Sequence, residues 1–180
     1  VFKYFEEICS IPHGSRNLQQ ISDYLVDFAK AHELKYRQDE DLNVIIWKDG
    51  SKGYEASEPV ILQGHMDMVA VKEADCDKDM EKEGLDLEIN GDYISAKGTS
   101  LGGDDGIAVA YTLAVLDDEE MAHPPIEAIF TVNEEIGMLG AATIDVSDLK
   151  GRLFMNMDSE DEGVFTVSCA GGASVICKIP

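Results

Sequence analysis

Segments with helical periodicity alternate along this chain with short apolar runs typical of β-strands, and this alternation restricts the fold more than any other feature. Apolar residues repeat at helical spacing in residues 2–8 and again in residues 18–28. Such alternation is typical of an α/β fold, here with a mixed, mostly parallel sheet flanked by helices on both faces. Strands are expected at 42–47, 59–64, 126–132 and 153–157, and further helices from 102 to about 117–121 and at 137–142.

Turn residues predict how some of these segments are connected. Residues 48–57 contain two glycines and many polar side chains, as in a hairpin connection between the flanking strands. Asn90-Gly91 separates two short β-type runs and predicts a second hairpin. Residues 165–168 and 173–179 also read as strands, and they suggest the beginning of further structure, so that the chain is a portion of a longer protein.

The segment 73–86 is acidic and almost free of large apolar residues, which predicts an exposed loop. Its aspartates at 75, 77 and 79 are spaced as in a calcium-binding EF-hand loop. However, Met80 stands where the turn needs glycine, and Asp86 stands where the loop needs glutamate. We therefore exclude calcium binding there.

The overall charge limits the partners of this chain. It has 36 acidic and 14 basic residues, a formal net charge of −22. Nucleic acids and anionic membranes need clustered lysine and arginine, so neither is expected as a partner, whereas small molecules and metal ions are. No apolar run approaches the roughly 20 residues of a membrane span.

The four cysteines, at positions 9, 76, 169 and 177, form no C-x-x-C pair. We interpret them as reduced thiols of a cytoplasmic protein, and a disulfide between two of them stays open. The N-terminus has no basic region followed by an apolar stretch, as a secretion signal would have.

The strand predicted at 59–64 leads into a histidine and an aspartate. If the strand continues, His65 and Asp67 lie on the same face, because side chains of a strand repeat every second residue. A metal-binding imidazole commonly gives its second N–H to a carboxylate, so this pair supplies both a ligand and the group that orients it. The alternative is an ordinary polar pair at a strand end.

Two adjacent aspartates follow the glycines 102–103. Asp104 or Asp105 could cap the following helix, or one carboxylate could bridge two cations about 3.5–4 Å apart. No Lys-Ser/Thr follows the glycines, which excludes a phosphate-binding loop.

Acidic residues also follow the last two predicted strands. Glu134 and Glu135 come directly after the run 126–132, where two carboxylates at the end of a core strand would repel each other unless cations compensate. We assign one glutamate as a metal ligand and the other as a general base. Asp158 follows the strand at 153–157, and residues 160–162 are expected to face water.

Taken together, these motifs place one histidine and several carboxylates, without cysteine, at one edge of a sheet. Imidazole and carboxylate ligands suit zinc, manganese or cobalt. Two divalent ions would offset four of the local negative charges.

At these motifs the sequence resembles the N-terminal catalytic region of the dinuclear zinc aminoacylase and carboxypeptidase clan, and most closely the aminoacyl-histidine (Xaa-His) dipeptidases. The resemblance spans nearly the whole chain. It rests on ICSIPHGS at 8–15, LQGHMDMV at 62–69, AKGTSLGGDDGIAVA at 96–110, NEEIGMLGA at 133–141, MDSEDEG at 157–163 and CAGG at 169–172.

The resemblance implies a role for each motif. His65, Asp104 and Asp158 would bind one zinc, and Asp104 would bridge to a second zinc held by Glu135. Glu134 would be the general base that takes a proton from the water between the metals, and Asp67 would steady His65. The peptide bond between Asp104 and Asp105 would be cis.

The resemblance also implies an activity and a domain organisation. It predicts a cytoplasmic dipeptidase that hydrolyses Xaa-His or a broad range of dipeptides, with residues 1–168 as the N-terminal part of a zinc-peptidase-like catalytic domain. Residues 169–180 would begin the connection into a lid domain, absent from this chain, through which a homodimer could form. The last metal-binding histidine would also lie downstream, because His13, His32 and His123 are poor substitutes.

Two other readings stay open. One is a related metal-dependent tripeptidase or N-acyl-amino-acid deacylase with the same metal core. The other is a non-catalytic fragment that retains the fold.

Overall fold

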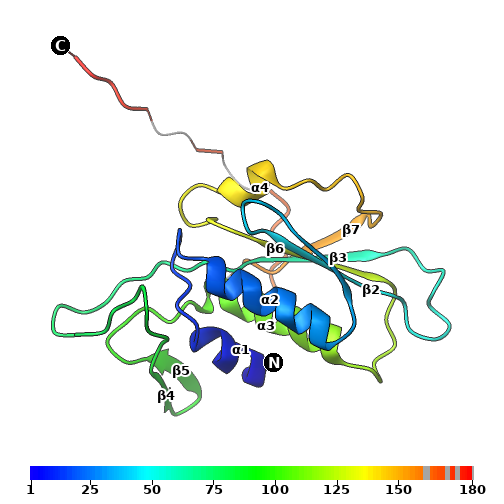
Figure 1. Cartoon of the computed structure of the whole chain (residues 1–180), viewed down its shortest axis with the longest axis horizontal. Coiled ribbons are helices and arrows are strands. Elements are labelled where there is room, and N and C mark those ends of the chain that lie inside the picture. The colour runs from blue at the N-terminus through cyan, green and yellow to red at the C-terminus, as the bar shows by residue number, and fades with distance from the viewer. Residues whose placement is uncertain (160–162, 169–170, 173–174, 180) are drawn as a thin grey trace.

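A five-stranded mixed sheet forms the centre of the computed structural model, which describes residues 1–159, 163–168, 171–172 and 175–179 (Figure 1). The strands lie in the order β1-β2-β6-β3-β7. Only β2 runs against the other four, so the predicted mixed, mostly parallel sheet is confirmed. The strand bounds are β1 Lys35–Gln38, β2 Val44–Lys48, β3 Val60–His65, β6 Ile126–Thr131 and β7 Leu153–Asn156.

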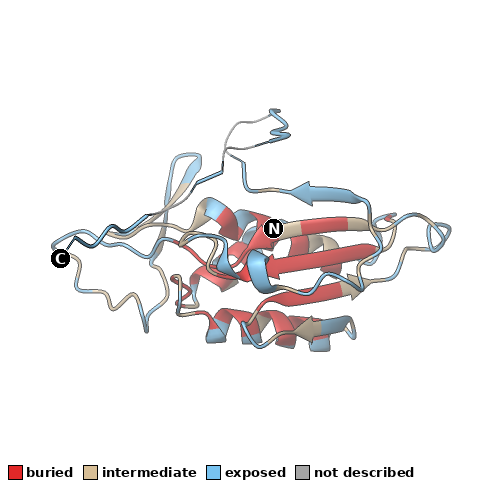
Figure 2. Cartoon of the chain, turned by 90° about the horizontal axis from the view of Figure 1, so that it is seen from above, coloured by how far each residue is buried: buried red, intermediate tan, exposed pale blue. Residues whose placement is uncertain are grey.

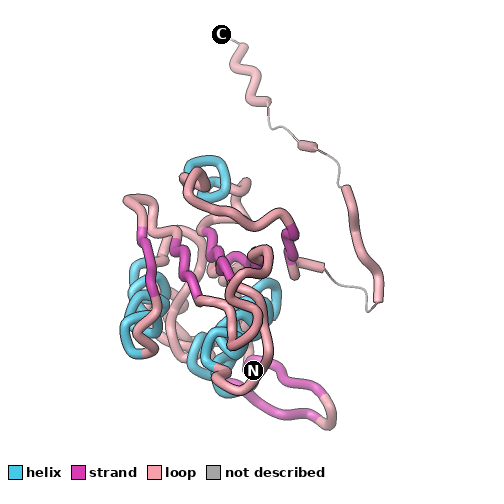
Figure 3. The backbone as a smooth tube through the Cα atoms, turned by 90° about the vertical axis from the view of Figure 1, so that its right-hand side faces the viewer, coloured by secondary structure: helices cyan, strands magenta, loops and turns pink. Residues whose placement is uncertain are grey.

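Helices cover one face of this sheet much more fully than the other. On the well-covered face α2 and α3 pack against the strands, and α1 packs on α3 (Figures 1 and 3). On the opposite face the short α4 and the segment after it place Ile144 and Leu149 over a small apolar cluster. The expected helical cover on both faces is therefore confirmed, although it is uneven. The helix bounds are α1 Phe2–Cys9, α2 Gln19–Ala31, α3 Gly103–Asp117 and α4 Leu139–Thr143.

The central strand is β6, and all six of its residues are buried. Of the core residues predicted from helical periodicity, Phe2 at the start of α1 is 74% exposed, so that prediction is wrong, whereas the others are buried: Phe5, Ile8, Leu18, Ile21, Leu25 and Phe28. Figure 2 shows this buried centre between the helices and the exposed edge strand β7.

The expected hairpin over residues 48–57 is wrong, because β2 and β3 do not pair with each other. Both pair with β6, which lies between them. Because β6 is buried on both faces, its backbone groups need hydrogen-bonding partners along both edges, and β2 and β3 supply them. The sequence did not reveal this pairing because β6 lies far along the chain from both strands. Strand β1 was not expected either, because its sequence KYRQ has no apolar pattern.

The second expected hairpin is confirmed. Strands β4, Leu87–Asn90, and β5, Tyr93–Ala96, pair with each other outside the main sheet. The turn lies one residue later than the Asn90-Gly91 signal suggests, at Gly91 and Asp92. Gly91 has a φ of 63°, a conformation that favours glycine.

The strands expected near the C-terminus are not formed in the described residues 163–168 and 175–179. Phe165, Val167 and Ile176 are 87%, 94% and 85% exposed, and in the part of the chain that the structure describes no strand pairs with them. An apolar run needs such a partner to become a strand. Predictions for residues 160–162 and 173–174 lie outside the described residues.

Two remaining expectations concern cysteines and membranes. Cys9, Cys76 and Cys177 are free thiols, while Cys169 lies outside the described residues. Among the described residues, every helix is too short or too polar to cross a membrane.

Candidate metal centre

The sheet topology brings the predicted site residues to one place. Strands β3, β6 and β7 are neighbours and parallel, so their carboxyl ends lie at the same edge of the sheet. His65 ends β3, the two glutamates follow β6, and Asp158 follows β7. Helix α3 begins beside this edge and packs closely on β3 at Gly64, where a Cβ atom would lie 2.9 Å from the Ala108 Cβ. Four sequence-distant segments therefore meet.

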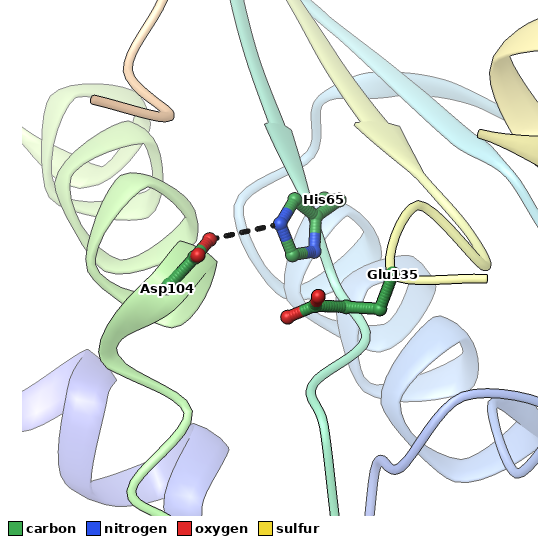
Figure 4. A group of neighbouring side chains, drawn as sticks. All are labelled: His65, Asp104 and Glu135. Atoms are coloured by element: carbon green, nitrogen blue, oxygen red, sulfur yellow. Dashed lines mark hydrogen bonds and ion pairs between the residues drawn. The ribbon is translucent and has the colours of Figure 1, made fainter. Parts of the chain in front are cut away.

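His65 is 1% exposed, and both of its ring nitrogens have partners. Nδ1 lies 2.9 Å from the backbone carbonyl of Asp67 and 3.5 Å from its Oδ1. Nε2 faces Asp104 Oδ1 at 3.1 Å, as drawn in Figure 4, and Glu134 Oε2 at 3.8 Å. A carbonyl only accepts, so Nδ1 carries a proton, and Nε2 is the nitrogen directed at the acidic groups.

The surrounding carboxylates set the charge of this imidazole in the metal-free chain. Burial alone lowers the pKa of His65, but the hydrogen bond to Asp67 and the charges of Asp105, Asp67 and Glu134 raise it to about 9. A divalent cation that binds at Nε2 would compete with a proton for this nitrogen.

Asp67 is buried and accepts hydrogen bonds on both carboxylate oxygens. The Ser15 hydroxyl donates to Oδ2 at 2.8 Å, and the backbone N–H of Glu134 donates to Oδ1 at 3.0 Å. Burial alone would raise the pKa of Asp67, but the hydrogen bonds from His65, Ser15 and Glu134 lower it below its usual value. Asp67 is therefore a fixed anion that joins β3 to the glutamate-bearing loop.

Asp105 is a buried member of the site that our sequence reasoning did not select. Its Oδ2 accepts the backbone N–H of His65 at 3.1 Å. Burial, together with the charges of Asp158 and Asp104, raises its pKa to about 7, against the lowering effect of His65. Its helical spacing to the apolar residues Ala108 and Val109 was the signal that could have found it, because that spacing puts Asp105 on the buried face of α3.

Neither aspartate at the start of α3 caps the helix, so that reading of the Gly-Gly-Asp-Asp motif is wrong. The N-cap is Gly102, and no side chain bonds to the free N–H groups there. Both aspartates contact His65 instead. Asp104 Oδ1 lies 3.1 Å from its Nε2, and Asp105 Oδ2 accepts its backbone N–H at 3.1 Å. The peptide bond between them is cis, as the resemblance implied.

The remaining acidic groups are more open to water. Asp104 and Asp158 are exposed, and Glu134 and Glu135 are half-buried. Burial, followed by the charges of the neighbouring carboxylates, raises the pKa of Glu134, Glu135 and Asp158. These acids repel one another without a counterion, which is the condition that a bound cation relieves.

The structure brings these side chains together in two overlapping groups. His65, Asp104 and Glu135 form one, and His65, Glu134 and Asp158 form the other, with ligand atoms within 4.8 Å of one another in each. One imidazole with carboxylates is a donor set that zinc, manganese and cobalt accept, so the residues fit a divalent metal. The division differs from the one that the resemblance implied, which joins Asp158 to Asp104 and keeps Glu134 free as the base.

We call His65, Asp67 and Asp105 the buried wall of the site, and Asp104, Glu134, Glu135 and Asp158 the open wall. Figure 4 shows His65 of the buried wall together with two residues of the open wall, Asp104 on α3 and Glu135 on the loop after β6.

The other histidines lie outside these groups. His13 is buried, and its pKa is lowered chiefly by that burial, while its Nδ1 lies 2.6 Å from the Ile11 carbonyl. His32 is the C-cap residue of α2 and stacks on Phe28 at 4.3 Å between ring centroids. His123 is buried beside Pro124, whose carbonyl lies 2.8 Å from its Nδ1.

With this geometry established, comparison with solved structures shows that the fold is that of peptidases. Aminoacylhistidine dipeptidase from Vibrio alginolyticus superposes with a TM-score of 0.87 at 41% identity, over 90% of this chain and 33% of that one. A tripeptidase from Staphylococcus aureus superposes with a TM-score of 0.73 over 89% of this chain and 43% of that one. At 23% identity it supports the fold alone.

Sequence comparison shows that the chain is similar to a dipeptidase. The chain is 41% identical, over 93% of its length, to the cytosol non-specific dipeptidase of Escherichia coli. The resemblance to the aminoacyl-histidine dipeptidases is thus confirmed, and the homologues of this chain are peptidases. No protein-family model matches the chain. The chain spans about a third of the length of these two relatives, 35% of the Escherichia coli dipeptidase and 33% of the Vibrio alginolyticus dipeptidase.

Proposed function

We propose that this chain is the metal-binding part of a dipeptidase catalytic domain that hydrolyses the peptide bond of Xaa-His or a broad range of dipeptides. The observation that carries the proposal is the convergence of His65 with Asp104, Glu134, Glu135 and Asp158 at one sheet edge. The similarity to two dipeptidases supports the substrate class. The location named for one relative, the cytosol, is proposed for this chain too.

His65, Asp104, Glu135 and Asp158 are the residues that would hold the metal ions. Two divalent ions, which we propose to be zinc, with manganese or cobalt as alternatives, would lower the pKa of water towards 7 and polarise the peptide carbonyl when bound. Residues 1–168 would form part of the catalytic domain, and a lid domain following residues 169–180 would complete it and support a homodimer.

Glu134 has the properties needed for a general base. Its side chain is 31% exposed, so it faces the open side of the site while its backbone N–H is held by Asp67. Its raised pKa makes it a stronger proton acceptor than an ordinary glutamate. Glu134 would take a proton from the attacking water and pass it to the amine that leaves.

Asp67 orients the other residues without reaching the substrate. Its backbone carbonyl and carboxylate both face His65 Nδ1, which keeps Nε2 directed at the open wall. A fixed tautomer is what a metal-binding histidine requires.

The proposal is tested by metal content and by substrate choice. The 180-residue chain, loaded with zinc and dialysed, should retain metal in elemental analysis. The natural protein, whose intact mass shows whether it has the length of the relatives, should cleave carnosine or other dipeptides faster than a tripeptide or an N-acetyl amino acid.

Other outcomes select the other readings. Preference for the tripeptide or for the acetylated amino acid would reassign the substrate within the same metal core. A chain that retains no zinc after loading would instead be a non-catalytic fragment with the peptidase fold.

A further inference from the structure

A short segment near the N-terminus, residues 13–16, lies against the residues that follow β3. The His13 carbonyl accepts the N–H of Met68 at 3.2 Å, and the N–H of Ser15 donates to the Met68 carbonyl at 3.2 Å. Gly14 forms a parallel bridge with Met68, and a Cβ atom on Gly14 would lie 2.7 Å from the Ala70 Cβ. Glycine is therefore needed for the segment to approach this closely.

The same segment reaches two parts of the candidate site. The Ser15 hydroxyl donates to Asp67 Oδ2 at 2.8 Å. The next residue, Arg16, donates its backbone N–H to the Asn133 side-chain oxygen at 2.7 Å. Asn133 directly precedes Glu134, so the segment contacts both the orienting carboxylate and the loop of the general base.

The two carboxylate oxygens of Asp67 have different hydrogen-bond partners. Oδ1 accepts the Glu134 N–H at 3.0 Å and lies 3.5 Å from His65 Nδ1, whereas Oδ2 accepts Ser15. A buried carboxylate needs donors on both oxygens, and the donor on Oδ2 stops the group from turning about its last torsion. Without it, Oδ1 can leave Glu134 and His65.

We propose that Ser15 is a positioning residue of the metal centre, which acts by fixing the Asp67 carboxylate and, through it, His65 and the Glu134 loop. This inference rests on the proposed function, because it assumes that His65 binds a metal. It assigns to the ICSIPHGS motif a task in the site, in addition to its packing against β3.

The test compares Ser15→Ala, which removes the hydroxyl, with Ser15→Thr, which keeps it. Ser100→Ala is the matched control, since the Ser100 hydroxyl donates to the backbone carbonyl of Val69 beside the site but does not contact Asp67. Two quantities are measured on the 180-residue chain. They are zinc affinity, by competition with a chromophoric chelator, and amide hydrogen exchange of peptides that contain Glu134 in the metal-free chain.

Ser15→Ala should weaken zinc binding by about 10- to 100-fold, the usual effect of removing a group that supports a ligand. It should also speed exchange of the Glu134 amide. Ser15→Thr should restore both values, and Ser100→Ala should change neither. If Ser15→Ala does not fold, Ser15→Cys, with its weaker donor, should give the same effects in smaller measure.

Unchanged zinc affinity in Ser15→Ala would overturn the inference, even if exchange changes. Equal losses in Ser15→Ala and Ser100→Ala would overturn it as well, because they would show a general loosening of the loop. If the unsubstituted chain binds no zinc, the proposed function itself fails, and the inference fails with it. If the unsubstituted chain binds zinc and Ser15→Ala binds it with the same affinity, only the inference about Ser15 fails and the proposed function stands.

Discussion

The buried wall and the open wall of the site differ in what holds their side chains. In the buried wall, His65, Asp67 and Asp105 are at most 1% exposed and are fixed by hydrogen bonds within the protein. In the open wall, Asp104 and Glu134 have side chains that are 62% and 31% exposed, and their carboxylate oxygens face His65 Nε2 at 3.1 Å and 3.8 Å. The protein itself orders the first wall, and a cation would order the second.

The two walls therefore have different tasks, since the buried wall orients the site and the open wall would contact the metal and the substrate. Groups that must keep one orientation are held by backbone N–H groups and by the Ser15 hydroxyl, which cost no rearrangement when a ligand arrives. Groups that must meet a metal and a substrate stay accessible to solvent. Their carboxylates repel one another, and a bound divalent cation would reduce this repulsion. Substitutions in the two walls should therefore have different consequences.

The largest effect is expected for His65→Ala, which removes the only ligand shared by both candidate groups. Because loss of a supporting residue already costs about 10- to 100-fold in metal affinity, loss of this ligand should cost more than about 100-fold. Zinc competition assays measure it, with Asp158→Ala in the exposed part of the open wall as the comparison. Equal losses in the two variants would erase the distinction between the walls.

Glu134→Gln should separate catalysis from metal binding. General base catalysis contributes about 10²- to 10⁴-fold to rate, so dipeptide hydrolysis by the natural protein should fall by that range while zinc content is kept. Parallel measurements of kcat and zinc content test it. Loss of zinc together with activity would make Glu134 a ligand, as its grouping with Asp158 permits.

The metal-free chain should reveal Asp105 through pH. The pKa of Asp105 in the folded chain is about 7, above the ordinary 3.8. Its contribution to the free energy of unfolding is therefore fully present below about pH 4 and is lost as the pH rises through 7. Asp105→Asn cannot ionise, so its stability relative to the unsubstituted chain should rise between pH 4 and pH 8.

This comparison is made by chemical denaturation in the presence of a chelator. A stability difference between Asp105→Asn and the unsubstituted chain that does not change with pH would show that the carboxyl ionises in the folded state as freely as in water.

The smallest effect on the site is expected from a buried carboxylate elsewhere. Glu127, the second residue of β6, accepts the backbone N–H groups of Lys150 and Gly151, with a distance of 2.8 Å to Gly151. Glu127→Ala should lower the free energy of unfolding by about 1–3 kcal/mol, because these donors lose their acceptor.

Zinc affinity should stay unchanged in Glu127→Ala, and Glu127→Gln, which keeps one acceptor oxygen, should recover part of the stability. A marked loss of zinc affinity in either variant would show that the walls depend on the whole sheet rather than on local contacts.

Three residues of the open wall were predictable from the sequence because each follows an apolar strand, and the fourth, Asp104, was predictable from the glycines before it. Glu134 and Glu135 come after β6 and Asp158 after β7, and parallel strands bring such positions together. The supporting contacts were not predictable in this way. Ser15 lies 52 residues from Asp67, and no local pattern relates a hydroxyl in a turn to a carboxylate at the end of a distant strand.

The same reasoning explains the errors in the fold. The connection over residues 48–57 has the composition of a hairpin, but pairing is decided by the strand that must be buried, and β6 enters the sheet between β2 and β3. Strand β1 exists because β2 offers it a free edge, and its own residues give no signal. Composition predicts which segments extend, whereas long-range pairing decides their neighbours.

The central claim is that His65 and the acidic residues of the open wall bind a metal together. Crystals of the zinc-loaded chain, measured at the zinc absorption edge, locate the ion by anomalous scattering. The account predicts an anomalous peak within bonding distance of His65 Nε2 and of the carboxylates of Asp104 and Glu135. A zinc ion found only at the acidic segment 73–86, with nothing beside His65, would contradict it.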